Sequence, residues 1–193
     1  MTLYLLRHGE TELNRTDRLQ GRVDEPLNRR GAAQARECAA RLAAAGLRFD
    51  KVIASPLDRA IRTAELVTGM PRDAILVDER ITEIDYGPWE ALPFERIDAE
   101  MMAFLRDPDH VPAPAGMESI PHLMDRTGDF LHAMAQDPAE KVLAVTHGVA
   151  IRAILGHLLG KHHQAVWGMP VENCVVYAAE RRDGRFLPAK KLI

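Results

Sequence analysis

Two histidines stand in the same local setting at distant points of the sequence. His8 follows a short apolar run near the N-terminus, His147 follows another such run far downstream, and a glycine comes directly after each. The carboxyl ends of parallel strands lie along one edge of a sheet, where ligands bind, so two such strands would bring both imidazole rings to one site. An imidazole can serve as a nucleophile or as a general acid and base. The matched pair therefore predicts a catalytic site at this edge rather than two ordinary turns.

Two arginines are placed to give that site a positive charge. Arg7 directly precedes His8, and Arg59 falls in the first turn of a helix expected after the apolar run 51–54. A planar guanidinium group binds two phosphate oxygens at once, and free N–H groups at a helix N-terminus attract anions. The pattern predicts a pocket for a multiply charged anion, whereas Arg62 is interpreted as a solvated charge on the helix.

Several carboxylates follow the third apolar run, and one of them is a candidate for proton transfer. Glu83 lies between Ile81 and Ile84, so we expect it to be partly removed from water. Burial favours the neutral form of a carboxyl group and suits it to proton transfer near neutral pH. Glu79 and Asp85 are competitors on spacing alone.

The elements that must position these residues form an alternating pattern of strands and helices. Short apolar runs of this kind suit strands buried on both faces, and their alternation with helical patterns predicts an α/β fold, a three-layer sandwich with a mainly parallel central sheet between helices. The expected strands span residues 3–6, 51–54, 75–77, 142–145 and 174–178, with 185–190 as an edge hairpin.

The expected helices are read from apolar residues at helical spacing. Ser55 and Pro56 are interpreted as an N-cap followed by proline in the first turn. Segment 107–116 contains three prolines, which exclude a regular helix and indicate a surface loop. The helices are expected at 30–46, after Pro56, at 120–134 and at 149–160.

Length and composition narrow the class of protein. The 193 residues are 47% apolar and 27% charged, which predicts one globular domain over residues 1–193. A net charge of −3 argues against a nucleic-acid partner. No apolar stretch has membrane-spanning length, and early charges argue against a secretory signal. Cys38 and Cys174 are too few for a disulfide framework, so we expect a cytoplasmic protein without a membrane partner.

At this point the chain resembles the histidine phosphatase superfamily, the phosphoglycerate-mutase-like proteins. The resemblance covers most of the chain, and its motifs occur in the family's order. Segment 89–97 also resembles the small bacterial phosphatases of broad or α-ribazole-phosphate specificity, although Ala91 stands where a glycine is common and Pro93 interrupts the next helix. The motifs are Arg7-His8-Gly9-Glu10-Thr11-Glu12-Leu13-Asn14, Leu19-Gln20-Gly21, Ser55-Pro56 with Arg59, Glu83-Ile84-Asp85-Tyr86-Gly87, and Val145-Thr146-His147-Gly148.

The resemblance implies a role for each reactive residue. His8 would be the nucleophile that becomes a phosphohistidine. Arg7, Arg59 and a protonated His147 would complete the phosphate pocket. Glu83 would protonate the leaving oxygen and then activate water.

Three further residues are implied at the entrance of the site, and no metal or cofactor is implied. Asn14 would donate a hydrogen bond to the phosphoryl group, and Gln20 and Gly21 would line the entrance. The partner would be a small-molecule phosphate ester, and the protein a monomer or a homodimer.

The activity expected from the resemblance is hydrolysis of a phosphomonoester. Family mutases carry a longer insertion between the acid motif and the late histidine, and the interval from Glu83 to His147 is short here. Residues 89–116 are the candidate cap segment over the site. Phosphoglycerate mutase remains an alternative, and a non-catalytic phospho-ligand-binding protein is the alternative from a different class. A metalloenzyme built on His157, His162 and His163 is disfavoured because adjacent residues on a helix point in different directions.

Overall fold

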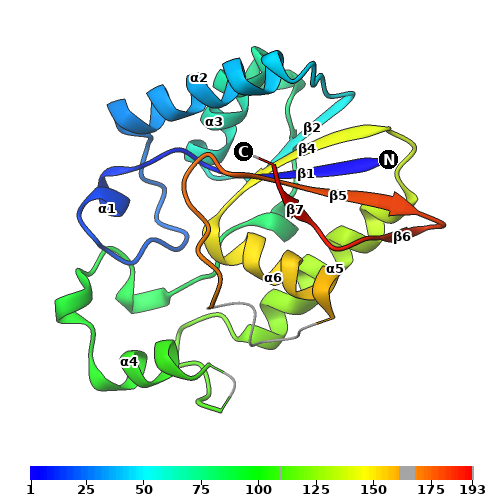
Figure 1. Ribbon diagram of the computed structural model, residues 1–193. Coiled ribbons are helices and arrows are strands. Elements are labelled where there is room, and N and C mark those ends of the chain that lie inside the picture. Colours follow the sequence, from blue (N-terminus) through cyan, green and yellow to red (C-terminus); the bar gives the residue numbers. More distant parts are fainter. Residues whose placement is uncertain (109, 161–167, 193) are drawn as a thin grey trace.

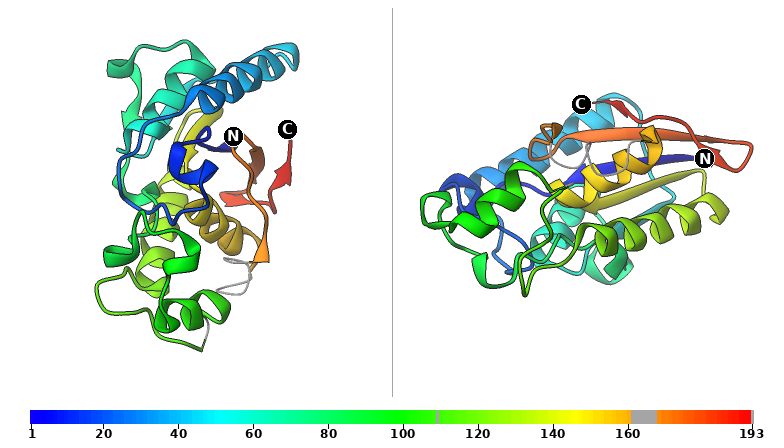
Figure 2. Two further views of the ribbon diagram at one scale, coloured as in Figure 1. Left: turned by 90° about the vertical axis from the view of Figure 1, so that its left-hand side faces the viewer. Right: turned by 90° about the horizontal axis from the view of Figure 1, so that it is seen from below.

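A seven-stranded sheet lies between two layers of helices (Figures 1 and 2). The computed structural model describes residues 1–108, 110–160 and 168–192. The strand order is β3-β2-β4-β1-β5-β6, and β7 pairs with β5. The strands are β1 (Thr2–Arg7), β2 (Lys51–Ala54), β3 (Leu76–Val77), β4 (Lys141–Thr146), β5 (Val176–Arg182), β6 (Arg185–Phe186) and β7 (Lys190–Lys191).

The predicted α/β sandwich with a mainly parallel sheet is confirmed. β1, β4, β2 and β3 run parallel, and β5 joins the edge of β1 antiparallel. Two strand predictions are wrong. Cys174, expected inside a strand, precedes β5 and has a positive φ of 56°. β3, expected to be buried, is a two-residue edge strand whose Leu76 and Val77 are 52% and 54% exposed.

Helices cover both faces of the sheet. In Figure 1, α2 and α3 lie on one side of the strands, and α5 and α6 lie on the other. Within the described residues, no helix combines the length and the apolar character needed to cross a bilayer. The helices are α1 (Glu12–Arg15), α2 (Arg29–Ala44), α3 (Asp58–Thr68), α4 (Ala99–Arg106), α5 (Ile120–Gln136) and α6 (Gly148–Leu159). The short 3-10 turns are η1 (Arg72–Ala74), η2 (Glu79–Ile81), η3 (Gly87–Trp89) and η4 (Phe94–Arg96).

The two faces of β1 build two separate apolar cores. Leu3 and Leu5 pack in the cluster that includes α5 and α6, whereas Tyr4 and Leu6 pack in the cluster that includes α2 and α3. Successive side chains of a strand point to opposite faces, so a continuous apolar run is what a doubly covered strand requires.

The start of α3 differs from the prediction. Its N-cap residue is Leu57, which provides no side-chain cap, and the predicted N-cap Ser55 lies two residues earlier. The Ser55 hydroxyl instead contacts His147, with a separation of 2.7 Å between Oγ and Nε2. Ser-Pro is a local signal for a helix start, and here the serine hydroxyl contacts a residue distant in sequence instead of capping the helix.

The candidate cap segment, residues 89–116, contains more regular structure than the expected loop. It holds η4 and α4, and Asp98 caps α4 by accepting a hydrogen bond from the Met101 amide. Residues 107–116 contain no regular helix among the described positions, as the prolines predicted. Trp89 and Phe104 are buried in a third apolar cluster with residues of α5 and α6, so this segment is packed against the body.

Candidate active site

The register of two neighbouring strands brings the two predicted histidines together. β1 and β4 pair Arg7 with Thr146, so His8 and His147 are the next residues on adjacent strands. Their ring centroids are 5.0 Å apart at an interplanar angle of 57°. Both side chains are buried, and the His8 amide donates to the Thr146 carbonyl. The predicted convergence at the carboxyl edge of the sheet is therefore confirmed.

The hydrogen bonds of His8 leave one ring nitrogen available for attack. Nδ1 lies 2.7 Å from the Gly9 carbonyl, an acceptor, so Nδ1 carries the proton and Nε2 carries the lone pair. Burial, and then the charges of Arg59 and Arg7, hold the pKa of His8 well below the ordinary histidine value. Asn173, which the sequence analysis did not single out, donates from Nδ2 to the His8 carbonyl at 2.9 Å and fixes the backbone.

The contacts of His147 fit a neutral imidazole, and the protonated form that the resemblance implies stays a prediction for the phosphate-bound site. Arg59 Nε donates to its Nδ1 at 3.3 Å, so the ring proton lies on Nε2, which faces the Ser55 hydroxyl at 2.7 Å. Burial is the largest cause that holds the pKa of His147 well below the ordinary value, followed by the charge of Arg59. Ser-Pro before a helix predicts a cap, so the local sequence gives no sign of the contact between Ser55 and the histidine.

Arg59 is fully buried and bonded to the protein on all three of its guanidinium nitrogens. Besides His147, it donates to the carbonyls of Val23 at 2.7 Å and Gly21 at 2.6 Å. Burial, the largest cause, lowers the pKa of Arg59 to about 10. The predicted phosphate ligand thus also holds the chain at residues 21–23 against the site.

Gly21 occupies a position that has no room for a side chain. A Cβ atom there would lie 2.1 Å from a Glu90 carboxylate oxygen and 2.6 Å from the Ile84 carbonyl. The same Glu90 carboxylate accepts hydrogen bonds at 2.6 Å from the amides of Arg22 and Val23. Glu90 and Arg59 therefore bind the same turn, residues 21–23. Glu90 accepts hydrogen bonds from its amides, and Arg59 donates hydrogen bonds to its carbonyls.

Glu83 is the acid that reaches the site, as predicted. It is 5% exposed and accepts hydrogen bonds from the amides of Ile84, Val149 and Ala150 at 3.0–3.1 Å. The last two amides belong to the first turn of α6, where the helix dipole favours a negative group. Of the two competitors, Glu79 is exposed, and Asp85 caps the Gly87 amide and pairs with Arg22.

A cavity of about 470 Å³ opens beside these residues. Arg7 Nε and Gln20 Nε2, both buried N–H donors on its lining, have no acceptor within the described part of the protein. Buried N–H donors nearly always have an acceptor. Two donors without one on the lining of the same cavity therefore indicate a ligand rich in oxygen acceptors. The lining residues are Arg7, Asn14, Asp17, Arg18, Leu19, Gln20, Glu83, Tyr86, Phe94, Gly148, Val149, Arg152 and Asn173.

The structure brings all eight predicted site residues to this region. Some of them line the cavity, and others are buried beside it. Asn14 and Gln20 line the cavity and bond to each other, since Asn14 Nδ2 donates to Gln20 Oε1 at 3.1 Å. His8, Arg59 and His147 are buried and do not line the cavity itself. Arg152, Tyr86 and Phe94 line it as well and were not predicted; the signal for Arg152 was its place one helical turn after Gly148.

The remaining candidate groups take structural roles. Burial raises the pKa of Cys38 to about 11 and that of Cys174 to about 12, so neither thiol is a reactive thiolate at neutral pH. His157 Nε2 lies 2.9 Å from the Met124 carbonyl at the contact between α5 and α6. His162 and His163 lie outside the described residues, and within those residues no group of three ligating side chains converges.

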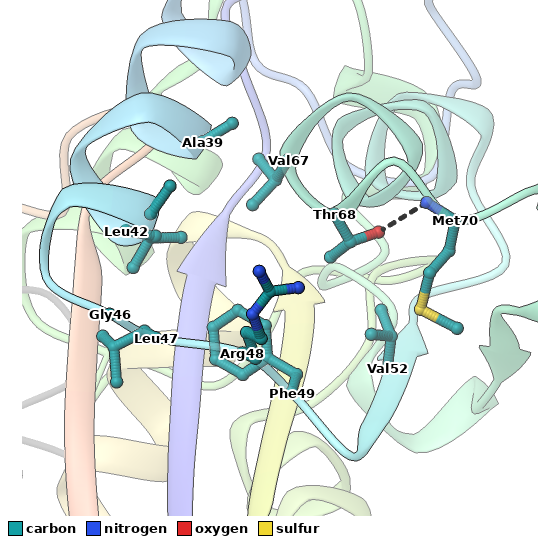
Figure 3. A pocket seen from close by; sticks show the side chains of 11 residues that line it. Ala39, Leu42, Gly46, Leu47, Arg48, Phe49, Val52, Val67, Thr68 and Met70 are labelled. Atoms are coloured by element: carbon teal, nitrogen blue, oxygen red, sulfur yellow. Dashed lines mark hydrogen bonds between the residues drawn. The ribbon is translucent and has the colours of Figure 1, made fainter.

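Another cavity, of about 480 Å³, lies between the C-terminal ends of α2 and α3 (Figure 3). Leu42, Leu47, Val67 and Met70 contribute to its mostly apolar lining. It opens near the start of β2, at the edge of the sheet opposite to the histidines. Arg48 is the one ionisable side chain on this lining, so the cavity lacks the reactive groups that the first one holds.

Comparison with known proteins agrees with this geometry. A sequence model of the histidine phosphatase superfamily (branch 1) matches residues 3–190. A Proteus mirabilis protein named "Probable phosphoglycerate mutase GpmB" is 31% identical over 192 residues, 97% of this chain and 88% of the relative.

Two solved structures of phosphatases superpose on nearly the whole chain. Phosphoserine phosphatase from Entamoeba histolytica, in complex with 3-phosphoglyceric acid, has a TM-score of 0.84 at 27% identity over 98% of this chain and 95% of its own. The α-ribazole phosphatase from Shigella flexneri has a TM-score of 0.84 at 25% identity, with 97% and 96% covered. With its paired histidines on adjacent strands, the chain belongs to the histidine phosphatase superfamily.

Proposed function

We propose that the protein is a metal-independent phosphomonoester hydrolase that acts on a small phosphorylated metabolite through a phosphohistidine intermediate. The observation that carries the proposal is the placement of His8, a buried imidazole beside His147 whose Nδ1 is held by the Gly9 carbonyl. This arrangement presents the Nε2 lone pair beside guanidinium groups, which is what attack on an anionic phosphorus centre requires.

The first half-reaction transfers the phosphoryl group to the enzyme. His8 Nε2 attacks phosphorus and forms an N–P bond as the bond to the ester oxygen breaks. Arg7 Nε and Gln20 Nε2, which lack protein acceptors, donate to the phosphoryl oxygens as their charge develops. Glu83 gives its proton to the departing alcohol oxygen.

The second half-reaction returns the enzyme to its starting state. Glu83, now a carboxylate, removes a proton from a water molecule that attacks phosphorus. The N–P bond breaks, inorganic phosphate leaves, and His8 is again neutral at Nε2. The amides of Ile84, Val149 and Ala150 hold the Glu83 side chain at the site.

The test is direct trapping of the intermediate. The wild-type protein, treated with EDTA and mixed with a radiolabelled phosphate ester, should form an acid-labile, base-stable phosphoenzyme and release phosphate. His8→Ala should fold normally, form no phosphoenzyme and lose turnover by about 10³-fold or more. His132→Ala, at an exposed histidine on α5, is the matched control and should retain full activity. Binding without turnover in the wild-type protein would establish a non-catalytic phospho-ligand binder instead.

Phosphoglycerate mutase is the second candidate, favoured by the name of the Proteus mirabilis relative. Hydrolysis is preferred because the interval between Glu83 and His147 is short compared with that of the family mutases, and an accessible phosphohistidine favours transfer of the phosphoryl group to water. Isomerisation of 3-phosphoglycerate, stimulated by 2,3-bisphosphoglycerate and faster than phosphate release, would reverse this preference.

We also propose that residues 89–116 act as a cap over the site and set the substrate preference. Residues 91–94 run antiparallel to residues 17–19, with hydrogen bonds between Leu19 and both Ala91 and Leu92. Phe94, 49% exposed, lines the cavity from this segment. A chimaera with the cap segment of a relative should change the preference order over a phosphate-ester panel, and an unchanged order would refute the role.

The setting that we propose is the cytoplasm, with a small molecule as the partner and with the protein acting as a monomer or homodimer. Two free thiols and a slightly acidic chain support this setting. Light scattering on the purified protein measures the oligomeric state.

A further inference from the structure

Asn173 connects the nucleophile to the side chains at the entrance of the site, although it lies 165 residues after His8 in the sequence. Its Nδ2 atom donates to the His8 carbonyl at 2.9 Å and to Asn14 Oδ1 at 3.4 Å. The nitrogen of a side-chain amide carries two protons, so these two contacts use both of its N–H groups. Asn173 also lines the active-site cavity, but with both N–H groups engaged it influences the reaction through its neighbours.

A chain of hydrogen bonds fixes which atom of each neighbouring amide faces the cavity. The chain starts at the Thr11 backbone N–H, which can only donate and lies 3.3 Å from Asn14 Oδ1. Asn14 therefore accepts at its oxygen from both Thr11 and Asn173, and its Nδ2 donates to Gln20 Oε1 at 3.1 Å. The Thr11 hydroxyl donates to the same Gln20 oxygen at 2.7 Å. The chain thus ends at Gln20 Nε2, the buried donor that has no acceptor in the described part of the protein.

The backbone around Asn173 is bonded to the strand that carries the nucleophile. The Cys174 amide donates to the Arg7 carbonyl at 3.0 Å, and the Arg7 amide donates to the Val175 carbonyl at 3.2 Å. Cys174 has a φ of 56°, in the left-handed region that a residue with a Cβ seldom adopts. Such strain persists where the surrounding contacts over-determine the backbone, and it is common at functional sites. These contacts give Asn173 a defined position relative to both Arg7 and His8.

We propose that Asn173 is a positioning residue that aligns the phosphoryl group with the nucleophile. It fixes the backbone of His8 and, through Asn14, directs the free N–H group of Gln20 toward the phosphoryl oxygens. Preorganised donors stabilise the charge that develops in phosphoryl transfer when they already point at it, and a displacement of about 1 Å can cost about 100-fold in rate. This inference rests on the proposed function and adds to it a residue that acts on both binding and attack.

The test compares Asn173→Ala with the wild-type protein on two esters, p-nitrophenyl phosphate and phosphoethanolamine. Because Asn173 acts on the phosphoryl group and not on the leaving oxygen, kcat/KM should fall by about 10- to 100-fold for both esters alike. Glu83→Gln should instead affect phosphoethanolamine far more than p-nitrophenyl phosphate. Glu172→Gln, at the exposed residue next to Asn173, is the matched control and should keep the wild-type kcat/KM for both esters.

A double-mutant cycle tests whether Asn173 acts through the neighbouring amides. Gln20→Ala removes the donor at the end of the chain, so the double variant with Asn173→Ala should lose less kcat/KM than the product of the two single losses. Urea unfolding establishes that each variant is folded. If Asn173→Ala fails to fold, the cycle is measured with Asn173→Asp, which keeps the shape of the side chain, lacks the N–H groups and should lose at least as much activity.

Three outcomes would overturn the role of Asn173 while phosphatase activity persists. They are a wild-type kcat/KM in a folded Asn173 variant, a loss confined to phosphoethanolamine, and single losses that multiply in the cycle. Failure of the proposed function gives a different result, because the wild-type protein would then form no phosphoenzyme with either ester.

Discussion

Nε of Arg59 lies 3.3 Å from Nδ1 of His147. A guanidinium group can only donate hydrogen bonds, so this contact requires a histidine that accepts at Nδ1 and carries its proton on Nε2. The positive charge beside the two rings therefore comes from Arg59 and Arg7, and burial lowers the pKa of both histidines. Neutral imidazole at His8 is the form that can attack phosphorus, and the same buried environment that lowers its pKa preserves that form.

The stability of the protein should depend on pH through these two histidines. Burial and the charges of Arg59 and Arg7 lower both pKa values in the folded state, so the unfolded chain takes up protons first as the pH falls. Stability is then fully present above the unfolded value of about 6.5 and is lost as the pH falls below it, by up to about 1.4 kcal/mol per pH unit for each histidine.

Urea unfolding measured between pH 7.5 and pH 5 checks this expectation. His147→Gln should reduce the slope by about half, and His132→Gln, on the surface, should leave it unchanged. The charges of Arg59, Arg7 and Arg126 also act on His147, and the pKa of the buried Glu118 carboxyl is lowered, so that it titrates below this range. A free energy of unfolding that is flat over this range would contradict the assignment of neutral histidines.

The sequence was sufficient to predict the meeting of the two histidines because it depends on two simple facts. Both residues come directly after buried strands, and strands that pair in parallel bring the residues that follow them to one edge of the sheet. The burial of Glu83 followed in the same way from its two isoleucine neighbours.

The contacts made across the fold could not be read from local patterns. Ser55 resembles a helix cap in sequence, but its partner His147 comes directly after β4, far along the chain. Arg59 was predicted as a ligand of phosphate, whereas its carbonyl acceptors at Gly21 and Val23 belong to a turn whose path no periodicity indicates. α4 was missed because Pro93 and the prolines after it suggested a continuous loop.

Glu83→Gln should affect substrates according to their leaving groups. An alkyl phosphate needs its departing oxygen protonated, so turnover of phosphoethanolamine should fall by roughly 10²- to 10⁴-fold. p-Nitrophenolate leaves with little protonation, so that ester should be affected much less. The measurement is kcat over a series of leaving groups, with Glu79→Gln, at an exposed carboxylate, as the control. An equal loss of kcat for every leaving group in the series would show that Glu83 is not the proton donor.

A buried ion pair should hold the Glu83 segment in place. Arg126 donates to the carbonyls of Thr82 and Glu83 and to both oxygens of Glu118, and the two side chains are 10% and 4% exposed. Burial alone would raise the pKa of Glu118, but the hydrogen bonds and charge of Arg126 hold it below the ordinary value.

Arg126→Met should therefore leave a buried carboxylate without its main partner and lower the free energy of unfolding by about 3–5 kcal/mol. The double variant with Glu118→Gln should lose less than the sum of the single variants, which a double-mutant cycle in denaturant measures. If the pair also positions the acid, folded Arg126→Lys should show the same leaving-group dependence as Glu83→Gln. Additive losses in the cycle would mean that the two residues act independently.

The backbone at Ala91 predicts a stabilising substitution. Ala91 has a φ of 61°, in the left-handed region, while its amide and carbonyl are both bonded to the facing segment, to Leu19 and Arg18 respectively. A residue with a Cβ is strained there, so Ala91→Gly should raise the free energy of unfolding by about 1 kcal/mol, since the strain removed outweighs the added freedom of the unfolded chain. Ala40→Gly, at an exposed position inside α2, is the matched control and should lower stability by about 1 kcal/mol. Chemical denaturation measures the change in the free energy of unfolding for each variant. A loss of stability at both positions would show that the strain at Ala91 is smaller than the entropy cost of the added glycine.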